Sequence, residues 1–223
     1  MKKHLRALKR VLDRHCGTVI DETYWRFRSK KWAEAYISEE SINHPHRVWM
    51  AQHILNHFPD FKSLLEVGCA AGENLHVLHQ MRPEAALSGI EINANAVEVG
   101  NRHFKATGMP ITIMQGKADG LKKIPPQSVD VVLTDAMLIC IGPDKIEKVL
   151  GNFFRIARRG LVFMEWHSST HGSVYDDHWL HNYRALLGKF TNESNICFQK
   201  LPPELWGGMW AESGYLIVVR LPQ

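Results

Sequence analysis

Short apolar runs alternate with amphipathic stretches along most of this chain. Seven runs have the length and composition of β-strands, and they cover residues 63–67, 85–92, 111–114, 128–134, 161–166, 196–201 and 215–221. The fourth run, SVDVVLT, is apolar on both faces, which is typical of a central parallel strand. Helical patterns follow the first, second and fourth runs, and a proline-marked loop follows the third, so their order predicts an α/β fold with a parallel sheet. The last two runs have a short connection and should pair antiparallel.

The predicted helices carry boundary signals of their own. Asn93 is an N-cap residue for the helix that Gly108 ends. Pro143 in a first turn begins another helix, and Gly160 ends the connection that follows it. A further helical stretch is predicted around residues 179–187. The helix after Pro143 has the clearest apolar stripe, at Ile146, Val149, Leu150, Phe153 and Phe154.

The segment 62–74, KSLLEVGCAAGEN, says most about the chemistry of the chain. A buried strand leads through a tight turn between Gly68 and Gly72 into a helix. Glycines let the backbone approach a ligand closely, and a helix N-terminus favours negative charge. A dinucleotide-binding loop needs a third glycine at the position where this chain has Glu73. Nicotinamide cofactors therefore fit the turn poorly.

The order acidic-x-Gly-x-Ala-x-Gly, which starts at Glu66, resembles the first motif of class I S-adenosylmethionine-dependent methyltransferases. In that family the loop wraps the methionine part of the cofactor. The second strand ends in Glu91, some twenty-five residues later, where a carboxylate can accept hydrogen bonds from the ribose diol. A glycine turn with no such ligand is the alternative for the loop alone, but the later segments follow in the family's order.

The third strand leads into Gln115-Gly116-Lys117-Ala118-Asp119, where the family usually has Gly-Asp-Ala. There the Asp accepts from the adenine amino group, and the next backbone amide donates to the ring. This chain departs from the pattern, because Lys117 stands in place of that Asp and Asp119 lies two residues further on. The adenine contact could come from Asp119 or from the Ala118 backbone, and both stay open.

The resemblance covers residues 45–221 and implies a Rossmann-like seven-stranded, mostly parallel sheet with helices on both faces and an antiparallel C-terminal strand. It divides the chain into a basic, aromatic N-terminal appendage or lid, residues 1–44, and an S-adenosylmethionine-binding domain, residues 45–223. The segments NHPHR and GPDKIEKVL look like a bacterial branch that acts on small molecules. The residues that the resemblance assigns to the cofactor are Glu66, Gly68, Cys69, Ala70, Gly72, Asn74, Glu91, Ile92, Asn93, Lys117, Ala118, Asp119, Asp135, Ala136 and Met137.

Positive charge is concentrated at the start of the chain. Residues 1–31 hold ten Lys/Arg against three Asp/Glu, whereas the whole chain has a net charge of +4. The apolar seam among these charges, Leu5, Leu8, Val11 and Leu12, predicts an amphipathic helix. Such a helix could pack on the domain edge, or it could bind an acidic substrate, RNA or a partner. The aromatic residues that follow, Tyr24, Trp25, Trp32 and Tyr36, could form a lid over the cofactor or simply pack.

Other features of the composition indicate a cytoplasmic protein. No stretch approaches ~18 consecutive apolar residues, so no membrane span is expected, and no apolar segment of a secretory signal follows the basic start. The cysteines, Cys16, Cys69, Cys140 and Cys197, lack metal-binding spacing and are interpreted as reduced thiols. The absence of a Cys-x-x-x-Cys-x-x-Cys run argues against radical use of the same cofactor.

Methyl transfer requires mainly that a nucleophile be placed in line with the activated methyl group and that water be excluded. Candidates follow the fourth and fifth strands, and they are Asp135, Glu165, His167, His171, His178 and His181. His167 is predicted as the general base for an oxygen acceptor, although it could instead hydrogen-bond substrate or backbone. Asp135 is predicted to orient the cofactor or the substrate. The spacing of the histidines does not predict a metal site.

Two sequence motifs that are absent from this chain limit the class of methyl acceptor. The Asn/Asp-Pro-Pro-Tyr motif of enzymes that methylate base or Gln amino groups is replaced here by Thr134-Asp135-Ala136-Met137, and no Pro-Cys nucleophile is present. These absences favour a small-molecule acceptor methylated at oxygen or nitrogen. Trp166, Trp206, Met209 and Trp210 could wall its pocket or pack in the core. The alternatives are an RNA or protein methyltransferase that docks through residues 1–31, and a non-catalytic relative.

Overall fold

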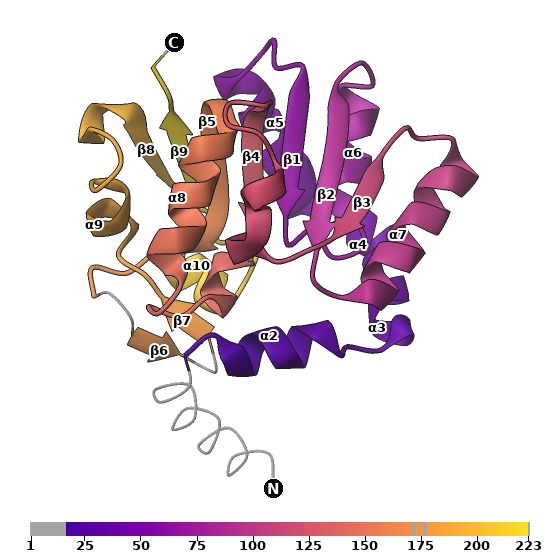
Figure 1. Ribbon diagram of the computed structural model, residues 1–223, viewed down its shortest axis with the longest axis horizontal. Helices are drawn as coiled ribbons and strands as arrows, with labels where there is room; N and C mark the ends of the chain where they lie inside the picture. Colours follow the sequence, from indigo (N-terminus) through magenta and orange to yellow (C-terminus); the bar gives the residue numbers. More distant parts are fainter. Residues whose placement is uncertain (1–16, 171–172, 176–177, 223) are drawn as a thin grey trace, which may run out of the picture.

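The computed structural model describes residues 17–170, 173–175 and 178–222 of the chain. Its seven-stranded sheet has the order β3-β2-β1-β4-β5-β9-β8 (Figure 1). The first five strands in that order are parallel, and β9 runs antiparallel to both neighbours, as predicted. The sheet strands are β1 Ser63–Val67, β2 Ala86–Glu91, β3 Thr112–Gln115, β4 Val129–Asp135, β5 Ala157–Trp166, β8 Ile196–Lys200 and β9 Gly214–Arg220. A separate antiparallel pair consists of β6 Ser173–Tyr175 and β7 His178–Leu180.

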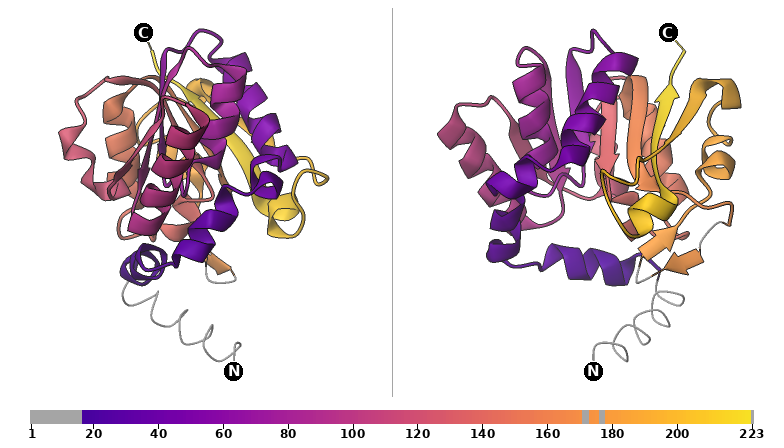
Figure 2. Two further views of the ribbon diagram at one scale, coloured as in Figure 1. Left: turned by 90° about the vertical axis from the view of Figure 1, so that its right-hand side faces the viewer. Right: turned by 180° about the vertical axis from the view of Figure 1, so that it is seen from behind.

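Helices cover both faces of the sheet. Purple α5 and orange α8 lie on opposite sides of it (Figure 2). α6 and α10 pack on the side of α5, and α9 packs on the side of α8. The α-helices are α2 Val19–Arg26, α3 Lys30–Tyr36, α4 Glu39–Ile42, α5 Pro45–His57, α6 Glu73–Met81, α7 Ala94–Thr107, α8 Ile146–Ile156, α9 Tyr183–Leu187 and α10 Met209–Ser213. Three 3₁₀ helices are η1 Ala118–Lys123, η2 Leu138–Cys140 and η3 Glu193–Asn195.

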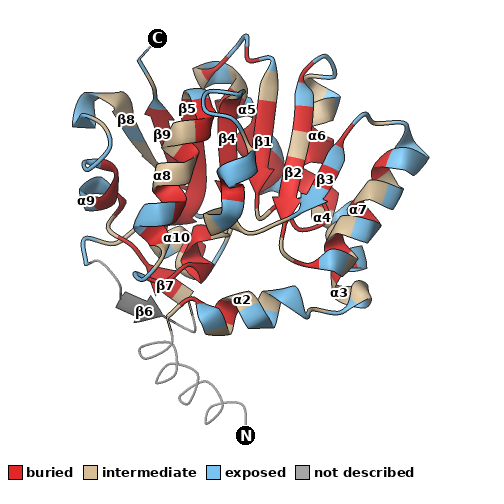
Figure 3. Ribbon diagram, viewed as in Figure 1, coloured by how far each residue is buried: buried red, intermediate tan, exposed pale blue. Residues whose placement is uncertain are grey.

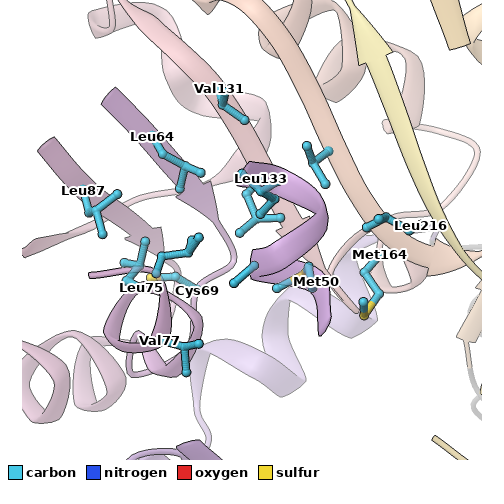
Figure 4. Close-up of a cluster of buried hydrophobic side chains, with 14 of the residues drawn as sticks. Met50, Leu64, Cys69, Leu75, Val77, Leu87, Val131, Leu133, Met164 and Leu216 are labelled. Atoms are coloured by element: carbon cyan, nitrogen blue, oxygen red, sulfur yellow. The ribbon is translucent and has the colours of Figure 1, made fainter. Parts of the chain in front are cut away.

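The central strands are apolar on both faces because each face meets a layer of helices. Leu64 belongs to the cluster under α5 and α6, whereas its neighbour Leu65 belongs to the cluster under α8. Figure 3 shows these strands as almost continuously buried. Figure 4 shows Met50 of α5 packed over the first cluster, beside Leu133 of β4. This packing holds the carboxyl ends of β1 and β4 side by side.

Two helix termini follow the sequence signals closely. Asn93 accepts a hydrogen bond from Ala96 N at 3.0 Å and so caps α7, and Gly108 ends that helix at a φ of 70°. Two other boundaries were predicted wrongly. Pro143 lies in a turn, and α8 begins only at Ile146. The stretch predicted as a helix from residue 179 begins as strand β7. The helix α9 starts only after Asn182, which caps it by accepting from Ala185 N.

Gly160 does not end the connection after α8 but lies inside β5, which begins at Ala157. There it pairs with Val131 of β4 and Arg220 of β9. A Cβ at this position would overlap the Phe58 ring and approach Val219 O to 2.6 Å. Gly160 is therefore required by close packing across the sheet and not by a turn.

The N-terminal helices lie against the end of the sheet. The arrowheads of β1 and β2 point toward α2, which crosses beneath them (Figure 1). Thr18 begins this segment, and its N and Oγ1 donate to Asp144 Oδ1 at 3.0 and 2.7 Å. Asn93 Nδ2 donates to the carbonyl oxygens of Trp25 and Arg28. The seam predicted at residues 5–12 lies outside the described residues. None of the described helices has both the length and the apolar character needed to cross a membrane.

Candidate active site

A cavity of about 400 Å³ lies at the carboxyl ends of the parallel strands, where open α/β sheets bind ligands. Thirteen of the fifteen residues predicted to bind the cofactor line it, namely Glu66, Gly68, Cys69, Ala70, Asn74, Glu91, Ile92, Lys117, Ala118, Asp119, Asp135, Ala136 and Met137. The other two, Gly72 and Asn93, do not line it. A Cβ at Gly72 would overlap the Phe104 ring, so this glycine serves the packing of α7. Asn93 is fully buried and ties down the N-terminal segment.

The glycine loop after β1 has a left-handed backbone at its two ends. Gly68 has a φ of 78° and Gly72 a φ of 89°, a region that glycine adopts without steric cost. Gly68 N donates to Ile90 O at 2.7 Å, which joins the loop to β2. A Cβ at Gly68 would overlap Cβ and Cγ of Met137. The cavity wall is therefore formed by bare backbone at this position.

Glu91, at the end of β2, holds the loop and faces the cavity at the same time. Its Oε2 accepts from Ala70 N at 3.0 Å, and its Oε1 accepts from Asn93 N at 2.8 Å. A carboxylate has about four acceptor sites, so acceptor capacity remains for a ligand hydroxyl. Burial raises the pKa of Glu91, and the bonds from the backbone amides of Asn93 and Ala70 oppose that shift. The carboxylate is thus fixed in place for a diol.

Glu91→Ala should weaken the binding of S-adenosylhomocysteine by about 10- to 150-fold. This range corresponds to the loss of a hydrogen bond to a charged group, about 1.5–3 kcal/mol. Titration calorimetry measures the change, with the exposed Glu98→Ala on α7 as the control. Equal affinity for parent and variant would show that Glu91 does not hold the ligand.

The cavity wall after β3 is bound to the N-terminal segment by charge. Lys117 and Lys145 both form ion pairs with Glu22 of α2. Asp119 Oδ2 lies 3.5 Å from Lys148 Nζ and 3.8 Å from Lys145 Nζ. Lys117, which departs from the family pattern, therefore links α2 to the sheet, while both Ala118 and Asp119 line the cavity.

A buried polar cluster forms the wall next to β1 and β4. Asn74 Nδ2 donates to Glu66 Oε1 at 2.7 Å and to Asp135 Oδ2 at 3.0 Å. Arg47 of α5 donates from Nη1 to Asn74 Oδ1 at 2.6 Å, and its Nη2 lies 3.4 Å from Glu73 Oε1. The Arg47 guanidinium thus pairs with Glu73 and Asp135 and is linked to Glu66 through Asn74.

Each of these carboxyl groups has one buried oxygen with no hydrogen-bond partner within the described part of the chain. The atoms are Glu66 Oε2, Glu73 Oε2 and Asp135 Oδ1, and all three residues line the cavity. A buried acceptor without a donor is costly, so this wall suits a ligand that brings N–H groups or positive charge.

Comparison with known proteins agrees with this geometry. A family model described as a methyltransferase domain matches residues 64–160. Residues 64–160 are thus similar to methyltransferase domains, and the fold around them is that of class I methyltransferases. The family, the fold and the cofactor that the sequence predicted, S-adenosylmethionine, are confirmed.

Three relatives show how far the similarity extends. A Haemophilus influenzae protein of uncharacterized function is 25% identical over 162 residues, 71% of this chain and 60% of its own length. The human tRNA N(3)-cytidine methyltransferase is 30% identical over 107 residues, 46% of this chain and 38% of its own. The magnesium protoporphyrin IX methyltransferase of Synechocystis, solved with bound SAM, has a TM-score of 0.65 at 15% identity and covers 90% of this chain and 96% of that one. The chain spans less than two thirds of both curated relatives.

The residues of this methyltransferase domain fit S-adenosylmethionine. Glu91 would hold the ribose, and the wall at Ala118 and Asp119 would meet the adenine. The unpartnered oxygen of Glu66 would accept a hydrogen bond from the cofactor's ammonium group, and the negative charge of Asp135 would lie near the sulfonium. Among the described residues that line the cavity, Arg47 carries the only guanidinium, and it could pair with the cofactor's carboxylate.

The protonation of the acidic wall depends on its burial. Burial raises the pKa of Glu73 to about 8, although Arg47 opposes the shift, and raises that of Glu66 well above its ordinary value. Burial would raise the pKa of Asp135 as well, but the hydrogen bond and charge of His46 and the charge of Arg47 outweigh it and leave this pKa lowered. Asp135 is therefore the ionised carboxylate of the wall.

The aromatic residues before the first strand pack on one another and also line the cavity. Trp25 and Trp32 have ring centroids 5.6 Å apart, and Trp32 and Tyr36 are 4.8 Å apart. All three line the cavity, whereas Tyr24 is half exposed and contacts Trp25 from outside. Burial raises the pKa of Tyr36 to about 12, and nearby Glu73 contributes. Trp25, Trp32 and Tyr36 therefore pack on one another, as one interpretation predicted, and also line the cavity, as a lid over the cofactor would.

Sequence reasoning missed several residues of the polar cluster. His46 and Arg47 lie in the NHPHR segment, which was noted only as a mark of a branch of the family. Pro45 in that segment begins α5, and α5 carries both side chains to the end of β4. The signal that could have found them is an adjacent His and Arg in the first turn of a helix whose apolar stripe is weak.

His167 is not at the cavity, which corrects its choice as a general base. Its ring packs against Phe198 and Tyr215, with centroids 5.0 and 5.3 Å away, and its Nδ1 accepts from Tyr183 N at 3.2 Å. Burial, and the charge of Arg184, lower its pKa. Successive side chains along a strand point to opposite faces of the sheet. Trp166 points to the side of α5, so His167, the next residue, points to the side of α9. We therefore do not retain it as a base.

The other histidine and carboxylate candidates are also occupied elsewhere. His181 Nε2 lies 2.8 Å from Ile141 O, and Glu165 accepts from the backbone that leads into η2. His178 contacts Trp166, and His171 lies outside the described residues. No group of three His, Cys, Asp or Glu side chains in the described ranges is placed to hold a metal ion. Of the candidates at the strand ends that the structure describes, Asp135 alone lines the cavity.

Proposed function

We propose that this protein is an S-adenosylmethionine-dependent methyltransferase that methylates a nitrogen or oxygen of a small molecule. The observation that carries the proposal is a single cavity in which the Gly68 loop, Glu91 and Asp135 face one another. These groups occupy the carboxyl ends of β1, β2 and β4 and would hold methionine, ribose and the reacting end in that order. Bound cofactor supplies the activated methyl group.

The chain's own residues would orient the reactants and keep water out. Trp25, Trp32 and Tyr36 wall the cavity from the N-terminal side, and Trp206 walls it from the loop before α10. Such walls strengthen electrostatic interactions inside the site and limit the acceptor to a molecule that fits between them. This enclosure supports a small acceptor.

RNA methylation is a second candidate function, supported by the tRNA methyltransferases among the relatives. A base would have to be turned out of its strand to reach Asp135 between these walls. The basic residues 1–31 would then supply phosphate contacts.

Cofactor binding and label transfer test the proposal together. Calorimetry should show S-adenosylmethionine and S-adenosylhomocysteine binding in the micromolar range and no NAD binding. Incubation with methyl-labelled cofactor and a cell extract, separated into small-molecule, RNA and protein fractions, should put the label in the small molecules. Label in RNA would support the second candidate, and NAD binding without S-adenosylmethionine binding would refute both.

A further inference from the structure

We propose that Asp135 binds the attacking atom of the acceptor, that this atom is a nitrogen carrying hydrogen, and that His46 is a positioning residue for the Asp135 carboxylate. The proposal rests on the proposed function and names the substrate class of the same site. Three observations support it: the position of Asp135 in the cavity, the different surroundings of its two oxygens and the packing of His46.

Asp135 lies where the reacting end of the cofactor would be. The adenine wall follows β3 and the ribose carboxylate follows β2, so a ligand held by them extends across β1 toward β4. Asp135 is the last residue of β4, and Met137, two residues on, contacts the backbone position of Gly68. The carboxylate thus faces the cavity just beyond the methionine loop.

The two oxygens of this carboxylate have different surroundings. Oδ2 lies 3.2 Å from His46 Nε2, accepts from Asn74 Nδ2 at 3.0 Å, and is 3.6 Å from Arg47 Nη1. Oδ1 is buried and has no hydrogen-bond partner in the described ranges, and only 6% of the side chain is exposed. An ionised carboxylate accepts hydrogen bonds and donates none. The group that meets Oδ1 must therefore be a donor.

A nitrogen acceptor makes the best use of such a carboxylate. The nitrogen lone pair forms the new bond to the methyl carbon while the carbon–sulfur bond breaks and its electron pair returns to sulfur. The nitrogen becomes positively charged and keeps its hydrogen, which Oδ1 can bind in a charge-assisted hydrogen bond. The proton then leaves to Oδ1 and on to water. A hydroxyl acceptor would need a stronger base, because the partners of Asp135 stabilise its ionised form.

His46 is held in one orientation by its neighbours. Its ring stacks on Trp206 with centroids 4.3 Å apart, and Trp206 stacks on Trp210 at 4.2 Å. Its Nδ1 contacts His44 Nδ1, and its Nε2 faces Asp135 Oδ2; because an ionised carboxylate only accepts, Nε2 is the donor of this pair. The side chain is 1% exposed and does not line the cavity. His46 can therefore act on a bound molecule only through the wall residues that it contacts, and Asp135 is the one that it meets with a polar atom.

Sinefungin tests the placement of Asp135 without knowledge of the acceptor, because it carries an ammonium group where the cofactor carries the methylsulfonium. The parent protein should bind sinefungin about tenfold or more tightly than the neutral sulfide S-adenosylhomocysteine. In Asp135→Asn this ratio should fall to about one to two, with S-adenosylhomocysteine still bound. A ratio that is the same in parent and variant would overturn the proposal.

Variants of His46 test the positioning role. His46→Leu should lower the ratio toward that of Asp135→Asn, and His46→Gln, which keeps a donor, should restore part of it. His53→Leu is the matched control on the same helix, since His53 contacts Trp49 O and Gln199 instead. Should His46→Leu fail to bind either ligand, the Gln variant decides: a ratio above that of Asp135→Asn supports the role, and a ratio no higher than that of Asp135→Asn contradicts it.

The identity of the attacking atom has its own readout. With ¹³C-methyl cofactor and the small-molecule fraction of an extract, the methyl carbon shift of the product distinguishes N-methyl from O-methyl. An O-methyl product would overturn the nitrogen acceptor while leaving the proposed function intact. Failure of the parent to bind S-adenosylmethionine or S-adenosylhomocysteine at all would instead refute the proposed function.

Discussion

Gly68→Val is expected to reduce the affinity for S-adenosylhomocysteine by about a thousandfold or more, to below detection by calorimetry. The valine side chain would need the space that Cβ and Cγ of Met137 occupy, and its backbone would have to keep a φ of 78°. Relief of either conflict moves the loop or the Met137 side chain into the cavity. Because both residues line the place for the methionine moiety, the binding surface itself is lost.

Gly108→Val separates the loss of the ligand from backbone strain. Gly108 also has a positive φ, of 70°, but a Cβ there meets no atom within 4 Å and the residue lies outside the cavity. This variant should lose about 1–3 kcal/mol of stability and bind the ligand like the parent. Equal losses of affinity in the two variants would mean that strain, and not contact with the ligand, explains the effect at Gly68.

Glu165→Ala should lower the free energy of unfolding by about 3–5 kcal/mol, which chemical denaturation can measure. The carboxyl group is fully buried and accepts from Thr134 Oγ1 at 2.9 Å and from the amides of Met137, Leu138 and Ile139 at 3.1, 2.9 and 3.2 Å. Alanine would leave these donors buried without partners. The turn after Asp135 would loosen, so cofactor affinity should fall as well.

Two further variants serve as comparisons for Glu165→Ala. Glu165→Gln keeps the volume and one carbonyl oxygen and should lose less than half as much stability as Glu165→Ala. Glu193→Ala removes an 82% exposed carboxylate that pairs with Arg184, and it should change stability by about 1 kcal/mol or less. If Glu165→Ala were as stable as Glu193→Ala, the buried hydrogen bonds to the turn would contribute little to the fold.

The cofactor-binding end of the cavity could be predicted because short stretches of sequence specify the strands and the residues that end them. The apolar runs predict strands, and adjacent residues such as Leu64 and Leu65 must then face opposite sides of the sheet. Once five strands are parallel, their carboxyl ends meet at one edge. Gly68, Glu91 and Asp135 each end or follow a strand, so the edge brings them together whatever the rest of the chain does.

The acceptor end depended on contacts that no local pattern contains. His46 meets Asp135 across 89 positions of the chain, and it does so only because α5 packs on the sheet through Met50 and Ile54. Trp206 reaches the same place from the loop between β8 and β9. Sequence spacing does not constrain such encounters, since the loops between the elements have many conformations of similar energy.

The position of His167 likewise depended on contacts between distant segments. The sequence by itself determined that this residue follows the fifth strand, and hence that it lies near the correct edge of the sheet. Only the tertiary structure decided that its ring packs with Phe198 and Tyr215 on the side of α9, away from the cavity. The physical reason is that strand periodicity separates the two faces, while the packing of distant segments determines which face meets the ligand.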